Sequence, residues 1–138
     1  MSDLLVPATP TITRQHVPRV RRGYRCDVSI GGVSFEITIN ATGEQLVEVD
    51  LQHAKHGTFG HGMSSAVVVL LNEALRHGMP IEAFVQRFLH TTFEPAGITD
   101  DPEVPRASSV MDYLAHRIAL DALPQERCQR LGVLVAAV

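Results

Sequence analysis

Three histidines, His53, His56 and His61, lie in or beside a short segment that also holds three glycines. Imidazole nitrogens at this spacing could bind zinc or nickel, so these side chains are candidate metal ligands. A metal site usually needs a fourth ligand in a rigid frame, and no cysteine lies nearby. A solvated loop between a strand and a helix would give the same pattern. We therefore predict no bound metal or other cofactor.

The same segment, residues 53–65, offers a site for an anion. A glycine-rich turn that leads into a helix exposes unpaired backbone N–H groups, which attract phosphate. The candidate binding residues, with an arginine brought in by folding, are Lys55, His56, Gly57, Thr58, His61 and Arg87. The residue order is not that of a P-loop, and glycines that merely permit close packing would look the same. Nucleotide or phosphate binding therefore stays open as one function.

A second candidate region is the acidic loop, residues 91–106, which joins two helical patterns. Paired carboxylates can serve acid–base catalysis or bind a divalent cation when they are buried. Pro95, Gly97 and Pro102 favour instead a rigid surface loop, which Phe93 would pin to the core. We predict a docking loop without catalytic residues. Its contact residues are Phe93, Glu94, Pro95, Asp100, Asp101 and Glu103.

The elements that would position these groups begin with three strands. Apolar and polar residues alternate from Tyr24 to Ile30 and from Val33 to Asn40. A third alternation has Val47, Val49 and Leu51 on one face and ends at Gln52. Gly31-Gly32 offers the positive φ angles of a tight hairpin turn, and residues 41–44 form a second turn. The alternation predicts an antiparallel meander whose apolar face needs a cover.

Helical patterns follow and supply that cover. The first, from Met63 to Leu75, is apolar nearly all round, which predicts a central helix buried on several sides. Gly78 is placed to end it. A second, amphipathic pattern covers residues 81–89.

The third helical pattern covers residues 110–118, with Ser109 as its N-cap. Pro124 is expected to end it, and residues 125–131 add a short turn of helix. The chain is therefore predicted to be one α+β domain over residues 19–138. Its order is a three-stranded antiparallel meander followed by three helices packed on one face.

Composition agrees with one globular domain, since 45% of the 138 residues are hydrophobic and 20% are charged. No apolar run approaches the ~20 residues of a membrane span. Residues 1–18 read as a flexible leader without the pattern of a secretory signal, which predicts a cytoplasmic protein. The two cysteines, Cys26 and Cys128, are not expected to pair there, and no CxxC motif exists.

Charge is unevenly distributed along the chain. The formal net charge is −3, which argues against a general nucleic-acid binder. The N-terminal part nevertheless carries a basic cluster, Arg14, Arg19, Arg21, Arg22 and Arg25. With Tyr24 as its one aromatic neighbour, this cluster fits a docking edge for an acidic partner better than a nucleic-acid platform.

Several segments in a fixed order resemble one known family. They are Ala54-Lys55-His56-Gly57-Thr58, His77-Gly78-Met79-Pro80, Phe93-Glu94-Pro95, the Asp112-Tyr113 helix, and Arg117-Ile118-Ala119-Leu120-Asp121 followed by Arg127 and Leu131-Gly132. From about Arg22 to about Leu134 the chain is similar to the C-terminal region of class II, adenosylcobalamin-dependent ribonucleotide reductases. In that family this region lies after the catalytic barrel.

The resemblance implies ancestry without the family's chemistry. The chain is too short for the barrel, and it has no reducible cysteine pair, so we do not expect catalysis on its own. We predict a non-catalytic accessory or interaction domain, either a free-standing paralogue or a fragment of a split enzyme. It would dock to a partner protein, such as a reductase catalytic subunit, and self-associate.

Overall fold

The computed structural model of the chain describes residues 14–42 and 45–133. Most of the predicted leader and the centre of the predicted second turn lie outside these ranges. At the described end of the leader, Arg14 pairs with Glu73 at 2.7 Å. The N–H of Gln15 donates to the carbonyl of Arg76 at 2.8 Å. Both contacts tie this end to the first helix.

The predicted α+β class is confirmed. The strands are β1 (Arg22–Ile30), β2 (Val33–Thr42), β3 (Gln45–Gln52), β4 (Gly97–Ile98) and β5 (Arg106–Ala107). The helices are α1 (Phe59–Arg76), α2 (Ile81–Phe88), α3 (Val110–Ala122) and α4 (Gln125–Leu131). None of the helices in the described part of the chain is long and apolar enough to cross a membrane.

The predicted meander is present as an antiparallel sheet in the order β1-β2-β3. Gly31 and Gly32 make its first turn with φ angles of 55° and 84°, as the hairpin prediction requires. The apolar face is buried, and the opposite face carries charged pairs such as Arg25–Glu36 at 2.7 Å. One irregularity was not predicted: the register shifts between Asn40 and Ala41, which places Leu46 in the core. The side chain of Val47 lies outside the described residues.

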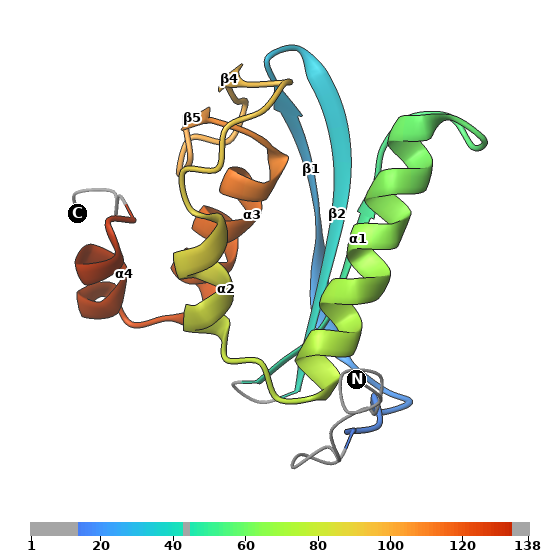
Figure 1. The fold of residues 1–138 in the computed structure, drawn as a ribbon. Coiled ribbons are helices and arrows are strands. Elements are labelled where there is room, and N and C mark those ends of the chain that lie inside the picture. The colour runs from blue at the N-terminus through green and yellow to red at the C-terminus, as the bar shows by residue number, and fades with distance from the viewer. Residues whose placement is uncertain (1–13, 43–44, 134–138) are drawn as a thin grey trace, which may run out of the picture.

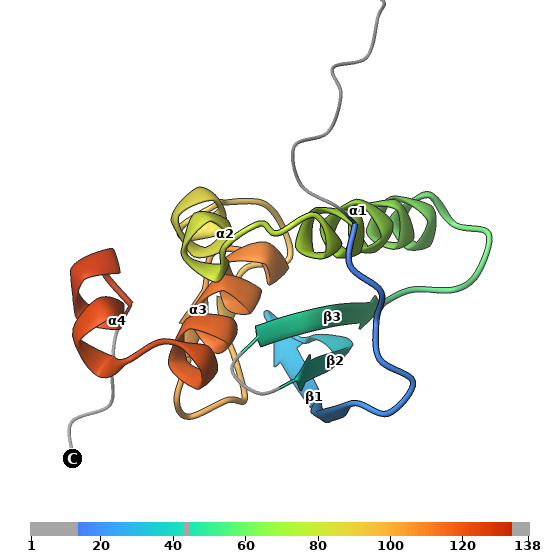
Figure 2. The same ribbon diagram turned by 90° about the horizontal axis from the view of Figure 1, so that it is seen from below.

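The helices gather on one face of the sheet, as predicted, with α1 over β3 and α3 beside β1 (Figures 1 and 2). An amide on α1 closes the edge of the sheet. Asn72 Oδ1 accepts the N–H of Val49 at 2.9 Å, and Asn72 Nδ2 donates to the Val49 carbonyl at 3.0 Å. Because Val49 lies on an edge strand, this side chain satisfies backbone groups that would otherwise be open to another strand.

The prediction that the first helix is central is wrong. Leu71 and Leu75 are the buried residues of α1, whereas Val69 and Leu70 are 62% and 70% exposed. The physical reason is the position of α1 at the edge of the sheet, where β3 covers only one side of the helix.

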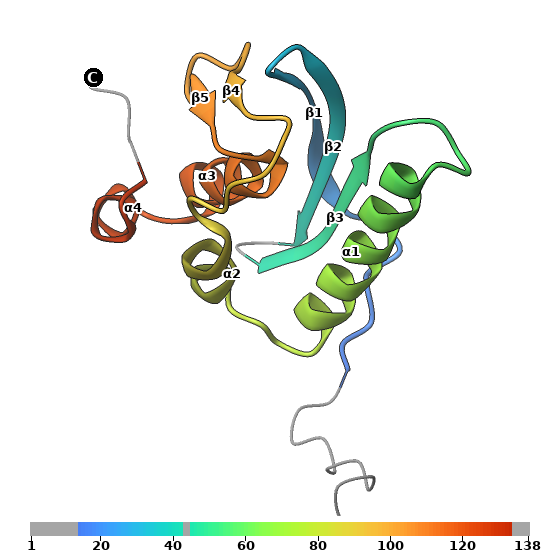
Figure 3. The same cartoon turned by 45° about the horizontal axis from the view of Figure 1, so that its top comes forward.

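The central helix is α3, in which residues 110–119 are all buried. It lies between the sheet and α4 and also contacts α2 (Figure 3). Its predicted N-cap is confirmed, because Ser109 Oγ accepts the N–H of Asp112 at 3.0 Å. Pro124 follows its end and starts α4, where the buried Cys128 thiol donates to the Ala119 carbonyl at 3.2 Å.

The segment between α2 and α3 contains structure that was not predicted, the two-residue strands β4 and β5. It lies close against the β1–β2 turn, where the Gly31 N–H donates to the Ile98 carbonyl at 3.0 Å. A Cβ at Gly31 would lie 2.5 Å from the Ala96 carbonyl oxygen, so a side chain there would collide with the backbone. Gly31 is therefore needed both for the hairpin turn and for the close contact between this turn and the backbone at Ala96.

Candidate functional site

The acidic loop, residues 91–106, is tied to the sheet by Asp100. The Asp100 carboxylate accepts the Ser29 N–H at 2.8 Å, and the Asp100 N–H donates to the Ser29 carbonyl at 3.3 Å. Asp101 closes a turn inside the loop, because its Oδ1 accepts the Glu103 N–H at 3.0 Å. Two of the predicted contact residues therefore hold the loop in place.

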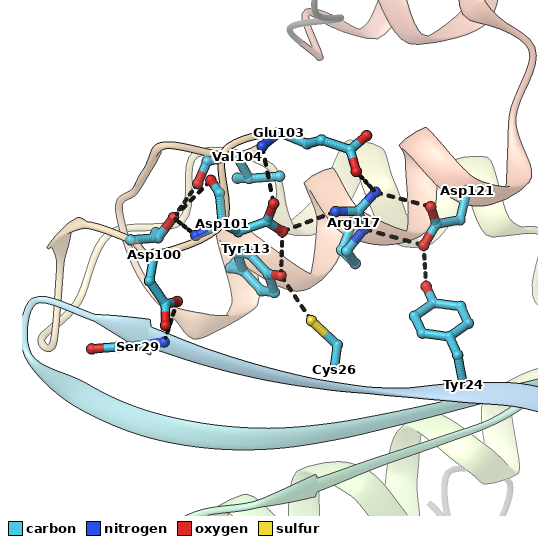
Figure 4. Close-up of polar contacts among 11 residues, drawn as sticks. Tyr24, Cys26, Ser29, Asp100, Asp101, Glu103, Val104, Tyr113, Arg117 and Asp121 are labelled. Atoms are coloured by element: carbon cyan, nitrogen blue, oxygen red, sulfur yellow. Dashed lines mark hydrogen bonds and ion pairs between the residues drawn. The ribbon is translucent and has the colours of Figure 1, made fainter.

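Arg117 on α3 is the centre of the polar cluster beneath this loop (Figure 4). Its guanidinium reaches Asp101 Oδ2 at 2.8 Å and both oxygens of Asp121, at 2.9 and 3.1 Å. Glu103 Oε1 lies 3.5 Å away. The Arg117 and Asp101 side chains are 9% and 12% exposed, so this pair is largely removed from solvent.

Two tyrosines and a cysteine extend the cluster to β1 (Figure 4). The Tyr113 hydroxyl donates to Asp101 Oδ2 at 2.6 Å and lies 3.2 Å from Cys26 Sγ. The Tyr24 hydroxyl donates to Asp121. These bonds join the sheet, α3 and the acidic loop. Tyr113 is thus a packing residue with a hydrogen-bonded hydroxyl, as is usual for a buried tyrosine.

The protonation states in the cluster are fixed by burial and pairing. Burial raises the pKa of Tyr113, and its hydrogen bond to Asp101 raises it further. Burial alone would lower the pKa of Arg117, but Asp121 and Asp101 raise it overall. Burial alone would raise the pKa of Asp101, yet hydrogen bonds, first from Tyr113, lower it overall. These directions keep the Tyr113 phenol protonated and the Arg117–Asp101 pair charged near neutral pH.

Phe93 does not pin the loop to the core, contrary to the prediction. Its side chain is 43% exposed, and the hydrogen bonds of Asp100 and Asp101 hold the loop instead. Phe93, Glu94 and Pro95 instead form one wall of a cavity of about 410 Å³, the apolar groove, at the N-terminal end of α1. Its other walls are Phe35, Leu51, His53, Phe59, Gly60, Met63, Ser64, Val67, Val110 and Met111.

An exposed apolar strip on α1 continues from this groove. It consists of Phe59, Met63, Val69 and Leu70. Phe59 is 83% exposed and Met63 is 50% exposed, and both also line the groove. Their spacing places them along one side of the helix, the side turned away from β3. Groove and strip form one continuous apolar surface.

The predicted phosphate site is organised by Thr58, which is the N-cap of α1. Its Oγ1 accepts the His61 N–H at 3.2 Å and donates to the Lys55 carbonyl at 2.8 Å. Gly57 precedes it with a φ of 86°. Within the described residues no hydrogen bond or ion pair joins Arg87 to this loop. Phosphate binding here stays a prediction.

The three candidate histidines, His53, His56 and His61, do not form a group of three ligand atoms. The rings of His56 and His61 lie 4.2 Å apart, centroid to centroid, whereas His53 stacks on Phe35 at 4.5 Å. Among the described residues, a different set has three ligand atoms within 4.8 Å of one another: His90, Asp112 and His116. This triad was missed, although Asp112 and His116 stand four residues apart on one helix, a spacing visible in the sequence.

The triad lines a second cavity, of about 550 Å³. Asp112 is held by two backbone donors, since the N–H groups of His90 and Ser108 lie 2.7 and 2.8 Å from its two oxygens. His116 Nε2 is 3.4 Å and His90 Nδ1 is 4.0 Å from Asp112 Oδ1. Burial alone would raise the pKa of Asp112, but its polar neighbours, first His116 and then the N–H groups of Ser108 and His90, lower it overall.

Comparison with known proteins gives one family match and a set of relatives. Residues 8–122 match the family described as TSCPD domain. Proteins described as vitamin B12-dependent ribonucleotide reductase are 38% identical over 121 residues in Streptantibioticus cattleyicolor and in Streptomyces avermitilis. The match covers 87% of this chain but 20% and 13% of those relatives. One from Agrobacterium fabrum is 27% identical over 80% of this chain. No solved structure matches.

Proposed function

The chain belongs to the TSCPD domain family, and from this premise we propose that it is a non-catalytic accessory domain that docks to the catalytic part of a vitamin B12-dependent ribonucleotide reductase. The chain spans only about an eighth to a fifth of the length of these reductases. In such relatives the matching segment is joined to a much larger remainder. A partner of that kind is therefore the natural occupant of an open surface on this chain.

The observation that carries the proposal is the continuous apolar surface made by the groove and the α1 strip. Leu70 and Phe59 are 70% and 83% exposed. A monomeric protein rarely exposes a large contiguous apolar patch, and such a patch rimmed by polar residues marks a binding surface. Phe93 and Met63 fit the role of anchors, because aromatic residues and methionine are enriched at interfaces.

The opposite face of the sheet does not compete for this role. It carries exposed ion pairs, such as Arg25 with Asp27 at 3.1 Å, which are well solvated. Partner binding is therefore expected on the helical face. A reducing compartment agrees with two free cysteines, Cys26 and Cys128, so the proposal includes the predicted cytoplasmic location.

The test measures binding of this chain to the reductase of the same organism, shortened by the segment that matches the chain. We expect a stable complex in calorimetry, weakened at least about ten-fold by Leu70→Lys or Phe93→Ser, as for central interface residues. Val20→Lys is the matched control, because Val20 is 83% exposed but lies before β1. Absence of a complex, or equal weakening by all variants, would refute the proposal.

A further inference from the structure

The triad His90, Asp112 and His116 serves neither the polar cluster nor the apolar surface. We propose that it binds one first-row divalent cation, with Zn²⁺ as the test ion, and turns an open coordination position toward the 550 Å³ cavity. The chemistry of the donors fits, since imidazole nitrogen and carboxylate oxygen are the ligands that zinc takes from histidine and aspartate. Three protein ligands with an open position are typical of catalytic rather than structural zinc sites.

The distances favour a shared cation over a simple hydrogen bond. His116 Nε2 lies 3.4 Å from Asp112 Oδ1, which is long for an N–H···O bond. Two ligands on a tetrahedral cation with bonds of about 2.0–2.1 Å stand about 3.3 Å apart. The His116–Asp112 pair already has that spacing. His90 Nδ1, at 4.0 Å from the same oxygen, needs a small movement of its ring.

Two of the ligands are held in place before any ion binds. The side chains of Asp112 and His116 are 3% and 10% exposed, and both lie on the buried helix α3. The N–H groups of Ser108 and His90 fix the Asp112 carboxylate. A carboxylate has about four lone-pair positions, so each of its oxygens keeps one for a further partner. Such outer contacts orient a metal ligand.

His90 completes the site from outside. Its side chain is 69% exposed, so its ring is free to close over an ion. Its backbone has a φ of 65°, in the left-handed region, where a residue other than glycine is uncommon and is held by its surroundings. Here the surroundings include the bond from its own N–H to Asp112.

The site is independent of the proposed docking surface. The cavity beside the triad and the apolar groove have no lining residue in common. Loss of cation binding therefore does not imply loss of partner binding, and each proposal fails or stands by its own measurement.

The experiment is calorimetry of the chelator-treated chain with Zn²⁺, supported by visible absorption with Co²⁺. We expect one cation per chain and a rise in melting temperature, because the ion binds the folded state. His90→Gly removes one ligand and suits the backbone φ of 65°, so folding is retained. It should weaken binding at least about ten-fold and abolish the thermal shift, as should His116→Gln.

The control is the double variant His56→Gln/His61→Gln, which removes the one other close histidine pair among the described residues. It should bind Zn²⁺ as the parent chain does. No binding by the parent chain, unchanged binding by His90→Gly and His116→Gln, or loss of binding in the double variant would each overturn the proposal.

Discussion

Arg117 is a buried cation that forms ion pairs with two carboxylates from different elements. Asp101 reaches it from the acidic loop, and Asp121 reaches it from the next turn of α3. Removing one member of a buried ion pair leaves the other without compensation, and this usually destabilises a protein by several kcal/mol. The loop that forms one wall of the apolar groove is therefore expected to depend on this side chain.

Replacing Arg117 by methionine tests this dependence. The methionine keeps an apolar stem but leaves Asp101 buried without its cation, so we expect a loss of about 3–5 kcal/mol in the free energy of unfolding. Urea denaturation measures it. The control is Arg25→Met, whose ion pairs lie on the exposed face and whose loss should cost about 0–1 kcal/mol. Equal losses in both variants would contradict the buried role of Arg117.

The pH dependence of stability follows from Asp101. Its folded pKa lies below the ordinary value of about 3.9, because its hydrogen bonds from Tyr113, Glu103 and Arg117 outweigh burial. A lowered pKa contributes stability that is fully present above the unfolded pKa and is lost as pH falls through the folded pKa. Asp101→Asn should therefore lower stability at neutral pH by about 1–3 kcal/mol. It should also flatten the loss of stability below about pH 4.

Urea denaturation at a series of pH values down to about pH 3 would check this. Some slope should remain, since the pKa of Asp112 is also lowered. Asp27→Asn, on the exposed face, serves as the comparison and should change stability at neutral pH by no more than about 1 kcal/mol. An Asp101→Asn variant with the full acid slope would show that the loop carboxylate is not what titrates.

At the scale of elements, the sequence predicts the sheet better than the helices. Strand alternation depends on neighbours along the chain, so Val28, Phe35 and Ile37 were correctly placed on the buried face. The burial of a helix depends on what lies around it in space. The first helix is the more apolar in sequence, yet α3 is buried, because the polar residues of α3 find partners in the distant acidic loop.

The same argument explains the triad. His90 lies on the acidic-loop side of α2, and Asp112 and His116 lie on α3, so folding brings them together across more than twenty residues. The spacing of Asp112 and His116 on α3 is visible in the sequence, but the proximity of His90 to them is not. The histidines of residues 53–65 are close in sequence, yet they do not form a group of three in space.

The exchange of roles between α1 and α3 gives a test at the element scale. Ala115 on α3 is fully buried, whereas Ala66 on α1 is exposed. Ala115→Leu adds volume to a filled core and should destabilise the fold by about 1–3 kcal/mol or more. Ala66→Leu should change stability by no more than about 0.5 kcal/mol. Thermal or urea unfolding of the two variants measures the difference. A larger loss from Ala66→Leu would place α1 in the core after all.

At the scale of the whole molecule, the surfaces differ in charge and in apolar exposure. The outer face of the sheet is charged, the edge of β3 is closed at Val49 by Asn72, and the apolar groove and strip remain open on the helical side. Association through strand pairing at β3 is therefore disfavoured where Asn72 occupies the edge. The apolar strip on α1 is therefore exposed in the chain as it stands alone.

The predicted self-association should consequently run through α1. We expect reversible association at high protein concentration in equilibrium sedimentation, because an exposed apolar strip gains by being covered. Leu70→Lys should keep the chain monomeric, since it places a charge in the strip at a side chain that is 70% exposed. Ile98→Lys is the control, because Ile98 is 68% exposed but lies on β4. If the parent chain is monomeric at every concentration, or if Ile98→Lys dissociates it as well as Leu70→Lys does, the strip is not a self-association surface.

A partner that covers the same strip would compete with self-association. Adding the shortened reductase should therefore also dissociate the homo-oligomer, whereas adding Zn²⁺ should leave the oligomeric state unchanged.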